Sequence, residues 1–123
     1  MTEREIVYNK YEGHCAYCGR KIDFKEMQVD HFHPKQLKTW INSPVMVELY
    51  KLPPDIENIK NKMPSCRRCN HYKRGLMIEN FRIVMKDLHK RIEKIYINKV
   101  AMDFGMMKVT PFNGEFYYEK MEC

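Results

Sequence analysis

Two Cys-x-x-Cys pairs constrain this chain more than any other feature of its sequence. The first pair is Cys15 with Cys18 and the second is Cys66 with Cys69. Two intervening residues let both thiolates of a pair point at one tetrahedral ion. In a reducing compartment this spacing favours metal binding over disulfides. Four thiolates would also close the coordination sphere, so we predict one structural zinc ion held by all four cysteines.

Other uses of these cysteines stay open at this point. An iron–sulfur cluster, a redox-active pair and unrelated buried thiols are the alternatives, and His14 is a candidate to replace one thiolate. Gly19 follows the first pair, where such a turn often needs a positive φ. The fifth cysteine, Cys123, is the last residue and is expected to be an exposed thiol. Two pairs on turn-like segments favour zinc over the alternatives.

Length and charge narrow the class of protein. A chain of 123 residues predicts a single domain, 1–123, and small domains often gain stability from a bound metal. The formal charge of +6 attracts polyanions, of which nucleic acid is the commonest. No apolar run reaches the roughly 18 residues of a membrane span. The N-terminus lacks the order of a signal peptide, so we predict a cytoplasmic protein with no membrane partner.

The pattern of apolar residues predicts a mixture of helices and short strands. Phe81, Val84 and Leu88 belong to a stripe at three- and four-residue steps, which predicts one long helix with a buried face. Asn113-Gly114 between apolar runs predicts a hairpin turn. The expected elements are a helix at 3–11, strands at 28–31 and 57–63, a short helix from about Cys69, a long helix at 78–101, and a hairpin at 108–119.

An acidic residue and a histidine stand side by side at the end of the first expected strand. Asp30 can bind a hard divalent cation through oxygen. His31 can accept a proton near neutral pH. Taken alone, each has an ordinary alternative: a capping or salt-bridging acid, and a core histidine. The residues around them decide between these interpretations.

In order, the chain carries Cys-x-x-Cys, Asp30-His31-x-x-Pro34, Asn58, and Cys-x-x-Cys-Asn70-x-x-Lys73. This order resembles the zinc-containing branch of the HNH endonuclease family. The resemblance covers about half of the chain. It implies an α+β fold with a small ββα-metal (His-Me finger) core at about 14–76, stapled by the four-cysteine zinc site. The N-terminal helix and the C-terminal helix and hairpin, 78–120, would be additions to that core.

The resemblance also implies a role for each matching residue. His31 would be the general base, and Asp30 with Asn70 would hold a catalytic Mg²⁺ or Mn²⁺. Asn58 matches the asparagine whose side chain braces the loop and so orients the histidine. Asn61 competes for that role, because the segment between Pro34 and Asn58 is longer than in compact members. The implied reaction is hydrolysis of phosphodiester bonds in DNA, leaving 5′-phosphate ends.

Basic residues cluster around the second cysteine pair. We predict nucleic-acid contacts, most directly to phosphates, from Arg67, Arg68, Lys73 and Arg74. His33 and His71 lie beside the predicted ligands, where each could join the metal or contact phosphate. Ordinary surface hydrogen bonds are favoured for both.

DNA is the predicted partner, and RNA stays open as a second substrate. A monomer would most simply nick, whereas a homodimer could cut both strands, and the sequence does not choose between them. The alternative function is a non-catalytic zinc-knuckle module that binds nucleic acid. Such a module would need the cysteines and basic residues, but it has no use for Asp30, His31 and Asn70.

Overall fold

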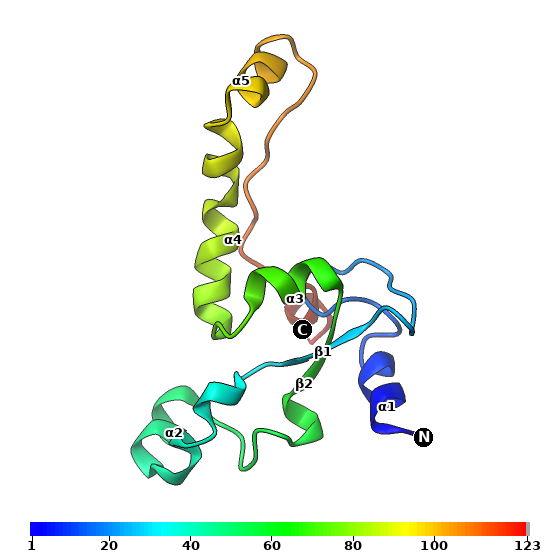
Figure 1. The fold of residues 1–123 in the computed structure, drawn as a ribbon, viewed down its shortest axis with the longest axis vertical. Coiled ribbons are helices and arrows are strands. Elements are labelled where there is room, and N and C mark those ends of the chain that lie inside the picture. Colours follow the sequence, from blue (N-terminus) through cyan, green and yellow to red (C-terminus); the bar gives the residue numbers. More distant parts are fainter. Residues whose placement is uncertain (123) are drawn as a thin grey trace. The chain divides into compact units, whose positions relative to one another are not determined.

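The computed structural model describes residues 1–122, so the predicted exposed thiol of Cys123 lies outside the described residues. The fold is α+β, as predicted, and the chain forms two compact units that are described separately. The first unit comprises Met1–Ile78 and the segment from Phe116 onward, and the second unit is Glu79–Glu115. Figure 1 shows the elements of both units.

A two-stranded antiparallel sheet forms the centre of the first unit. Strand β1, Gln28–His31, pairs with β2, Lys62–Ser65, and Asp30 stands opposite Met63. Helix α3, Arg67–Lys73, follows β2 directly and packs against β1. The predictions of β1 and of a short helix at the second cysteine pair are therefore confirmed.

The second strand begins later than the sequence pattern predicted. Residues Ile59–Asn61 form a 3₁₀ turn, η3. The backbone N–H of Lys60 in this turn donates to the side-chain oxygen of Asn58. An asparagine that bonds the backbone two residues onward favours a turn over an extended strand. The strand therefore starts only at Lys62 and includes Pro64, which a two-stranded sheet with free edges tolerates.

Helix α1, Glu3–Asn9, ends two residues before its predicted end. Thr2 and Glu5 cap its start reciprocally. After its end, Glu12 and Gly13 both adopt positive φ, which breaks the helical path. Lys10 joins this end to the sheet, because its ammonium donates to the carbonyl oxygens of Ile59 and Lys62 at 2.8 and 2.5 Å.

The segment between the strands folds around a small apolar cluster. It contains η1 (Lys35–Leu37), η2 (Trp40–Asn42) and α2 (Pro44–Tyr50). Ser43 caps α2, and Pro44 at its first position needs no hydrogen-bond partner for its nitrogen. The buried members of the cluster and the partly buried side chains around it are Leu37, Leu52, Ile56, Trp40, Ile41, Met46, Val47 and Met77.

The predicted long helix is divided into two. Helix α4 covers Ile78–Glu93, and α5 covers Tyr96–Asp103. The run Ile95-Tyr96-Ile97 is β-branched and aromatic, which lowers helix propensity. Ile95 is extended, and the carbonyl oxygen of Ile92 accepts from the Ile95 N–H at 3.3 Å and from the Asn98 side chain at 2.8 Å.

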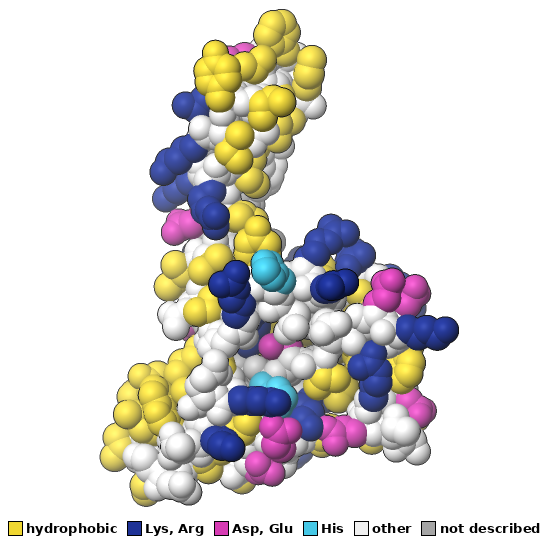
Figure 2. Space-filling model, in the orientation of Figure 1, with side chains coloured by type: hydrophobic (Ala, Val, Ile, Leu, Met, Phe, Trp, Pro, Cys, Tyr) yellow, Lys and Arg dark blue, Asp and Glu magenta, His cyan; other side chains and the backbone are white. Residues whose placement is uncertain are grey.

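The predicted apolar stripe is buried only in part. Phe81 is buried, whereas Ile95 and Tyr96 are 53% and 82% exposed, so the expectation of a buried face fails at its C-terminal end. Exposed apolar side chains continue along α5 and beyond it, and Figure 2 shows them gathered at the end of the second unit that carries this helix. An exposed apolar group of this kind is uncommon on a surface that faces only water.

The predicted C-terminal hairpin is absent from the described residues. The turn itself exists, since Gly114 has φ +90° and the Asn113 side chain accepts from the backbone N–H of Glu115 at 2.9 Å. Residues 107–116 belong to no helix or strand, and Arg82 of α4 donates to the carbonyl oxygen of Gly114. A helix, α6 (Tyr117–Met121), then replaces the second predicted strand. The side chain of Glu119 accepts from the N–H of Phe116 and so caps this helix.

Candidate metal centres and active-site pocket

The four predicted cysteines lie together in the first unit. The Sγ atoms of Cys15, Cys18, Cys66 and Cys69 are all within 4.8 Å of one another. A regular tetrahedron with Zn–S bonds of about 2.3 Å has S···S edges of about 3.8 Å. The Sγ atoms of Cys18 and Cys66, one from each pair, are 3.8 Å apart. The cluster can therefore hold a tetrahedral zinc ion, with two sulfurs from each pair. We call the turn at Cys15–Cys18 the first knuckle and the turn at Cys66–Cys69 the second knuckle.

Backbone geometry supports the sulfurs. Arg20 N–H approaches Cys18 Sγ at 3.5 Å, and Cys69 N–H approaches Cys66 Sγ at 3.4 Å. Gly19 has φ +79°, as its place after the first pair predicted, and a side chain there would collide with the ring of Tyr117. These turns place the donors that stabilise thiolates around a metal.

The chemistry of the donor set also fits a cation. The pKa of Cys18 is raised to about 11, mainly by its hydrogen bond with the Cys15 sulfur. Four sulfurs this close together repel one another as thiolates, and a divalent ion removes that cost. When bound, zinc would supply charge neutralisation and a fixed geometry, with no open position for substrate.

The first knuckle is tied to both the sheet and the C-terminal segment. Ala16 N–H donates to the Pro64 carbonyl oxygen of β2 at 2.8 Å. The N–H groups of Tyr117 and Tyr118, in α6, donate to the carbonyl oxygens of Tyr17 and Ala16 at 3.0 and 2.7 Å. The zinc cluster thus lies where three separate segments of the first unit meet.

Asp30 is buried and hydrogen-bonded on one side of its carboxylate. Its Oδ2 accepts from the Tyr17 hydroxyl at 2.5 Å and lies 3.0 Å from Lys73 Nζ. Burial, and then the charge of Asp30, raise the pKa of Tyr17 well above its usual value, so this hydroxyl stays protonated and donates. The contacts match the salt-bridging alternative for Asp30, and its role as a cation ligand remains a prediction.

Lys73 does not lie where the predicted phosphate contact requires it. Its side chain is fully buried. Its three ammonium protons have three acceptors, namely Asp30 Oδ2 and the carbonyl oxygens of His31 and Phe32 at 3.1 and 3.4 Å. No donor is left for a phosphate, so we correct this prediction: Lys73 connects α3 to the end of β1.

His31 has a carboxylate partner that sequence reasoning missed. Its Nε2 lies 3.1 Å from Glu57 Oε1, and its side chain is 15% exposed. Desolvation acts to raise the pKa of Glu57, but His31 and Lys62 beside it lower that pKa on balance, which keeps it a carboxylate. A carboxylate only accepts, so Nε2 donates, and Nδ1 is the nitrogen able to accept a proton in the neutral ring.

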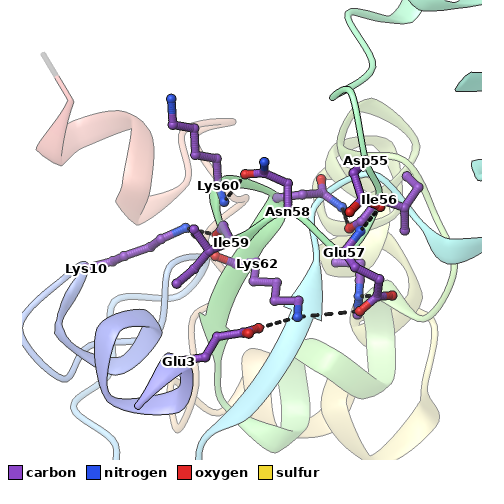
Figure 3. A network of polar contacts seen from close by, with 11 residues as sticks. Glu3, Lys10, Asp55, Ile56, Glu57, Asn58, Ile59, Lys60 and Lys62 are labelled. Atoms are coloured by element: carbon purple, nitrogen blue, oxygen red, sulfur yellow. Dashed lines mark hydrogen bonds and ion pairs between the residues drawn. The ribbon is translucent and has the colours of Figure 1, made fainter. Parts of the chain in front are cut away.

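Glu57 is itself held in a small network of charges. Lys62 Nζ lies 3.4 Å from Glu57 Oε2 and also pairs with Glu3 of α1. Figure 3 shows Lys62 placed between these two carboxylates. The signal for this partner was weak, since Glu57 precedes the predicted Asn58 in a segment expected to be a strand. Glu57 reaches His31 only because the segment between β1 and β2 folds back towards the end of β1.

The asparagine that braces the loop after β1 is Asn61, not Asn58. The Asn61 side chain is buried, accepts from the His33 N–H at 2.8 Å, and donates to the carbonyl oxygens of His33 and Ile56 at 3.1 and 2.9 Å. The Asn58 side chain instead caps the η3 turn through the N–H of Lys60. The role predicted for Asn58 is therefore performed by the competing residue.

We expect Asn61→Ala to lower the free energy of unfolding by about 3 kcal/mol, because it strands buried backbone groups of His33 and Ile56. Asn58→Ala removes one turn cap, and a loss of about 1 kcal/mol is expected. Urea denaturation of the two zinc-loaded variants compares these losses. Equal losses would contradict the assignment of the bracing role to Asn61.

Three of the predicted site residues line one pocket. Asp30 and His31 from β1 and Asn70 from α3 border an open pocket of about 380 Å³, with Arg74 at the same rim. Arg74 is exposed and adopts φ +49° at the end of α3. Chain segments far apart in the sequence therefore bring the predicted base, the two predicted cation ligands and a cationic side chain to one opening.

The remaining predicted residues lie outside this pocket lining. Arg67 and Arg68 are exposed at the start of α3, and His71 is exposed one turn later. His33 is half-buried, and burial, followed by the nearby charge of Lys73, lowers its pKa. On the face of the first unit that Figure 2 shows, Lys and Arg side chains are mixed with acidic ones and form no continuous basic surface. We therefore expect any phosphate contacts to be local to α3.

Comparisons of the chain with protein-family models, with curated proteins and with solved structures gave no match. Across residues 1–122, every helix is too short or too polar to cross a lipid bilayer. The function proposed below therefore depends on the geometry of the site and on the sequence resemblance to HNH endonucleases.

Proposed function

We propose that the protein is a metal-dependent endonuclease of the HNH type that hydrolyses phosphodiester bonds in DNA. The observation that carries this proposal is the shared pocket of Asp30, His31 and Asn70. Strand β1 supplies Asp30 and His31, and α3, which follows the antiparallel partner strand β2, supplies Asn70. This order of two strands and a helix is the one that a ββα-metal core would require. The four-cysteine cluster beside them would hold a structural zinc ion, since it leaves no position open for catalysis.

His31 is the proposed general base. Its Nε2 is engaged by Glu57, which fixes the ring and leaves Nδ1 to take a proton from water. The hydroxide formed would attack phosphorus, and the 3′ oxygen would leave. A Mg²⁺ or Mn²⁺ ion held by Asp30 and Asn70 would, when bound, stabilise negative charge on the phosphate and on the leaving oxygen. Glu57 would stabilise the positive charge that His31 gains.

Exposed arginines supply the proposed contacts to the substrate backbone. Arg74 shares the pocket rim with the reacting groups, and Arg67 and Arg68 extend the cationic surface along the start of α3. Guanidinium groups match phosphate oxygens in geometry and charge. Contacts of this kind position a nucleic acid without reading its sequence.

The ion pair of Asp30 with Lys73 favours a second candidate, a zinc-knuckle module that binds nucleic acid without cutting it. In that case the pair would serve only to join α3 to β1. The same exposed arginines would account for binding. The two candidates differ in whether a divalent cation enters the pocket and whether a phosphodiester is cleaved.

Supercoiled plasmid incubated with zinc-loaded protein and Mg²⁺ or Mn²⁺ tests the proposal. We expect nicking or linearisation that EDTA stops and that His31→Ala lowers by about 10²- to 10⁴-fold. His71→Ala is the matched control, since this histidine is exposed on α3 and outside the pocket lining. Binding of plasmid without cleavage by the folded wild type would favour the non-catalytic module. Equal loss in both histidine variants would contradict a special role for His31.

A further inference from the structure

The Asp30 carboxylate is held from two directions by buried groups. Tyr17 approaches from the first zinc knuckle, and Lys73 approaches from α3. Tyr17 is 3% exposed and Lys73 is 0% exposed, so water does not compete for either contact. Both bonds go to the same oxygen, Oδ2, which leaves Oδ1 for a cation in the pocket.

Tyr17 owes its position to the zinc knuckle. It stands between Cys15 and Cys18, its carbonyl oxygen accepts from Tyr117 N–H, and its ring packs edge-on against Phe116 with centroids 5.8 Å apart. The ring therefore cannot shift without disturbing the knuckle or α6. A residue fixed in this way holds its hydroxyl at a defined place relative to β1.

We propose that Tyr17 and Lys73 are positioning residues that orient Asp30 to present a single oxygen to the catalytic cation. This inference rests on the proposed function, since it concerns the cation of that site. Mg²⁺ and Mn²⁺ sites of this kind use one or two carboxylates and keep several waters, which a one-oxygen ligand suits. Partners that hydrogen-bond to a ligating group orient it and tune its basicity.

The arrangement has a consequence for the two metals. The zinc ligands set the position of Tyr17, and Tyr17 sets the position of Asp30. The structural ion thus contributes to the affinity of the catalytic one through a single hydroxyl. Lys73 has the opposite effect on the affinity for the catalytic cation. Its positive charge partly neutralises Asp30 and so weakens the attraction of that carboxylate for a second cation.

Binding of Mn²⁺ to the full-length, zinc-loaded protein, measured by electron paramagnetic resonance, tests the inference without a cleavage assay. Removal of the carboxylate in Asp30→Asn is expected to abolish binding. We expect Tyr17→Phe to raise the Kd for Mn²⁺ by about 10- to 100-fold, the range found when such supporting partners are removed. The zinc content and the far-UV circular dichroism of Tyr17→Phe should equal those of the wild type. Tyr8→Phe is the matched control, since its hydroxyl bonds the carbonyl oxygen of Ile22 and not Asp30.

A Kd for Tyr17→Phe within twofold of the wild type would overturn the inference while leaving the cation site intact. Failure of the wild type to bind Mn²⁺, or wild-type binding by Asp30→Asn, would overturn the cation site and the inference with it. If Tyr17→Phe does not fold, the unmodified protein still decides. The ¹³Cζ resonance of Tyr17, but not that of Tyr8, should shift when Mg²⁺ is added, and an unmoved Tyr17 signal would overturn the inference.

Discussion

Removal of zinc is expected to unfold the first unit. The four cysteines join the first knuckle to the start of α3, and without the ion four sulfurs would be left close together. Structural zinc sites in small peptides contribute about 10–16 kcal/mol, which equals or exceeds the stability of a typical domain. We therefore expect loss of the native circular dichroism and a change in Trp40 fluorescence when a chelator removes the ion.

Zinc added back should restore both signals, whereas Mg²⁺ should not. Protons compete with zinc for the thiolates, so the stabilisation should be present at neutral and higher pH and lost as pH falls. Cys15→Ser should lose the ion and fold poorly even with zinc in excess. A zinc-free protein that keeps a cooperative thermal transition would contradict this role for the cluster.

Lys73→Met is expected to cost about 3–5 kcal/mol of stability, because it leaves the buried carboxylate of Asp30 without its counter-charge. The methionine keeps the apolar length of the side chain but supplies none of the three donated hydrogen bonds. Urea denaturation of zinc-saturated protein measures the loss.

The double variant Asp30→Asn with Lys73→Met distinguishes a charge effect from a packing effect. If the ion pair causes the loss, neutralising both partners should cost less than the sum of the two single changes. An additive result, or a loss below about 1 kcal/mol for Lys73→Met alone, would contradict the role given to this pair.

Local patterns predicted the parts of the fold that local chemistry determines. The cysteine spacing indicated which thiols meet, and the run ending at His31 indicated β1. The structure bears out both. A turn-forming asparagine was also visible in the sequence. The sequence did not show which asparagine braces the loop. The choice between Asn58 and Asn61 depends on the 3₁₀ turn at Ile59–Asn61, which the sequence pattern did not predict.

Long-range partners could not be read from the sequence. Lys73 looks like any other basic residue beside the second knuckle, and its burial depends on Asp30, which lies far away along the chain. Glu57 reaches His31 only because the segment between the strands folds back around its own apolar cluster. In the second unit, the low helix propensity of the residues around Ile95 opposed the three- and four-residue apolar pattern, and the predicted long helix is divided there.

The chain leaves the first unit after Ile78 and returns to it at Phe116, so both ends of the second unit are fixed by the first. For such an excursion the entropy of closing the loop changes slowly, by about 0.6 kcal/mol for each doubling of length. The excursion can therefore lengthen, shorten or change composition at little cost to the metal centres. Evolutionary divergence among relatives of this protein should accordingly accumulate between these two junctions, while the segments on either side stay nearly constant in length.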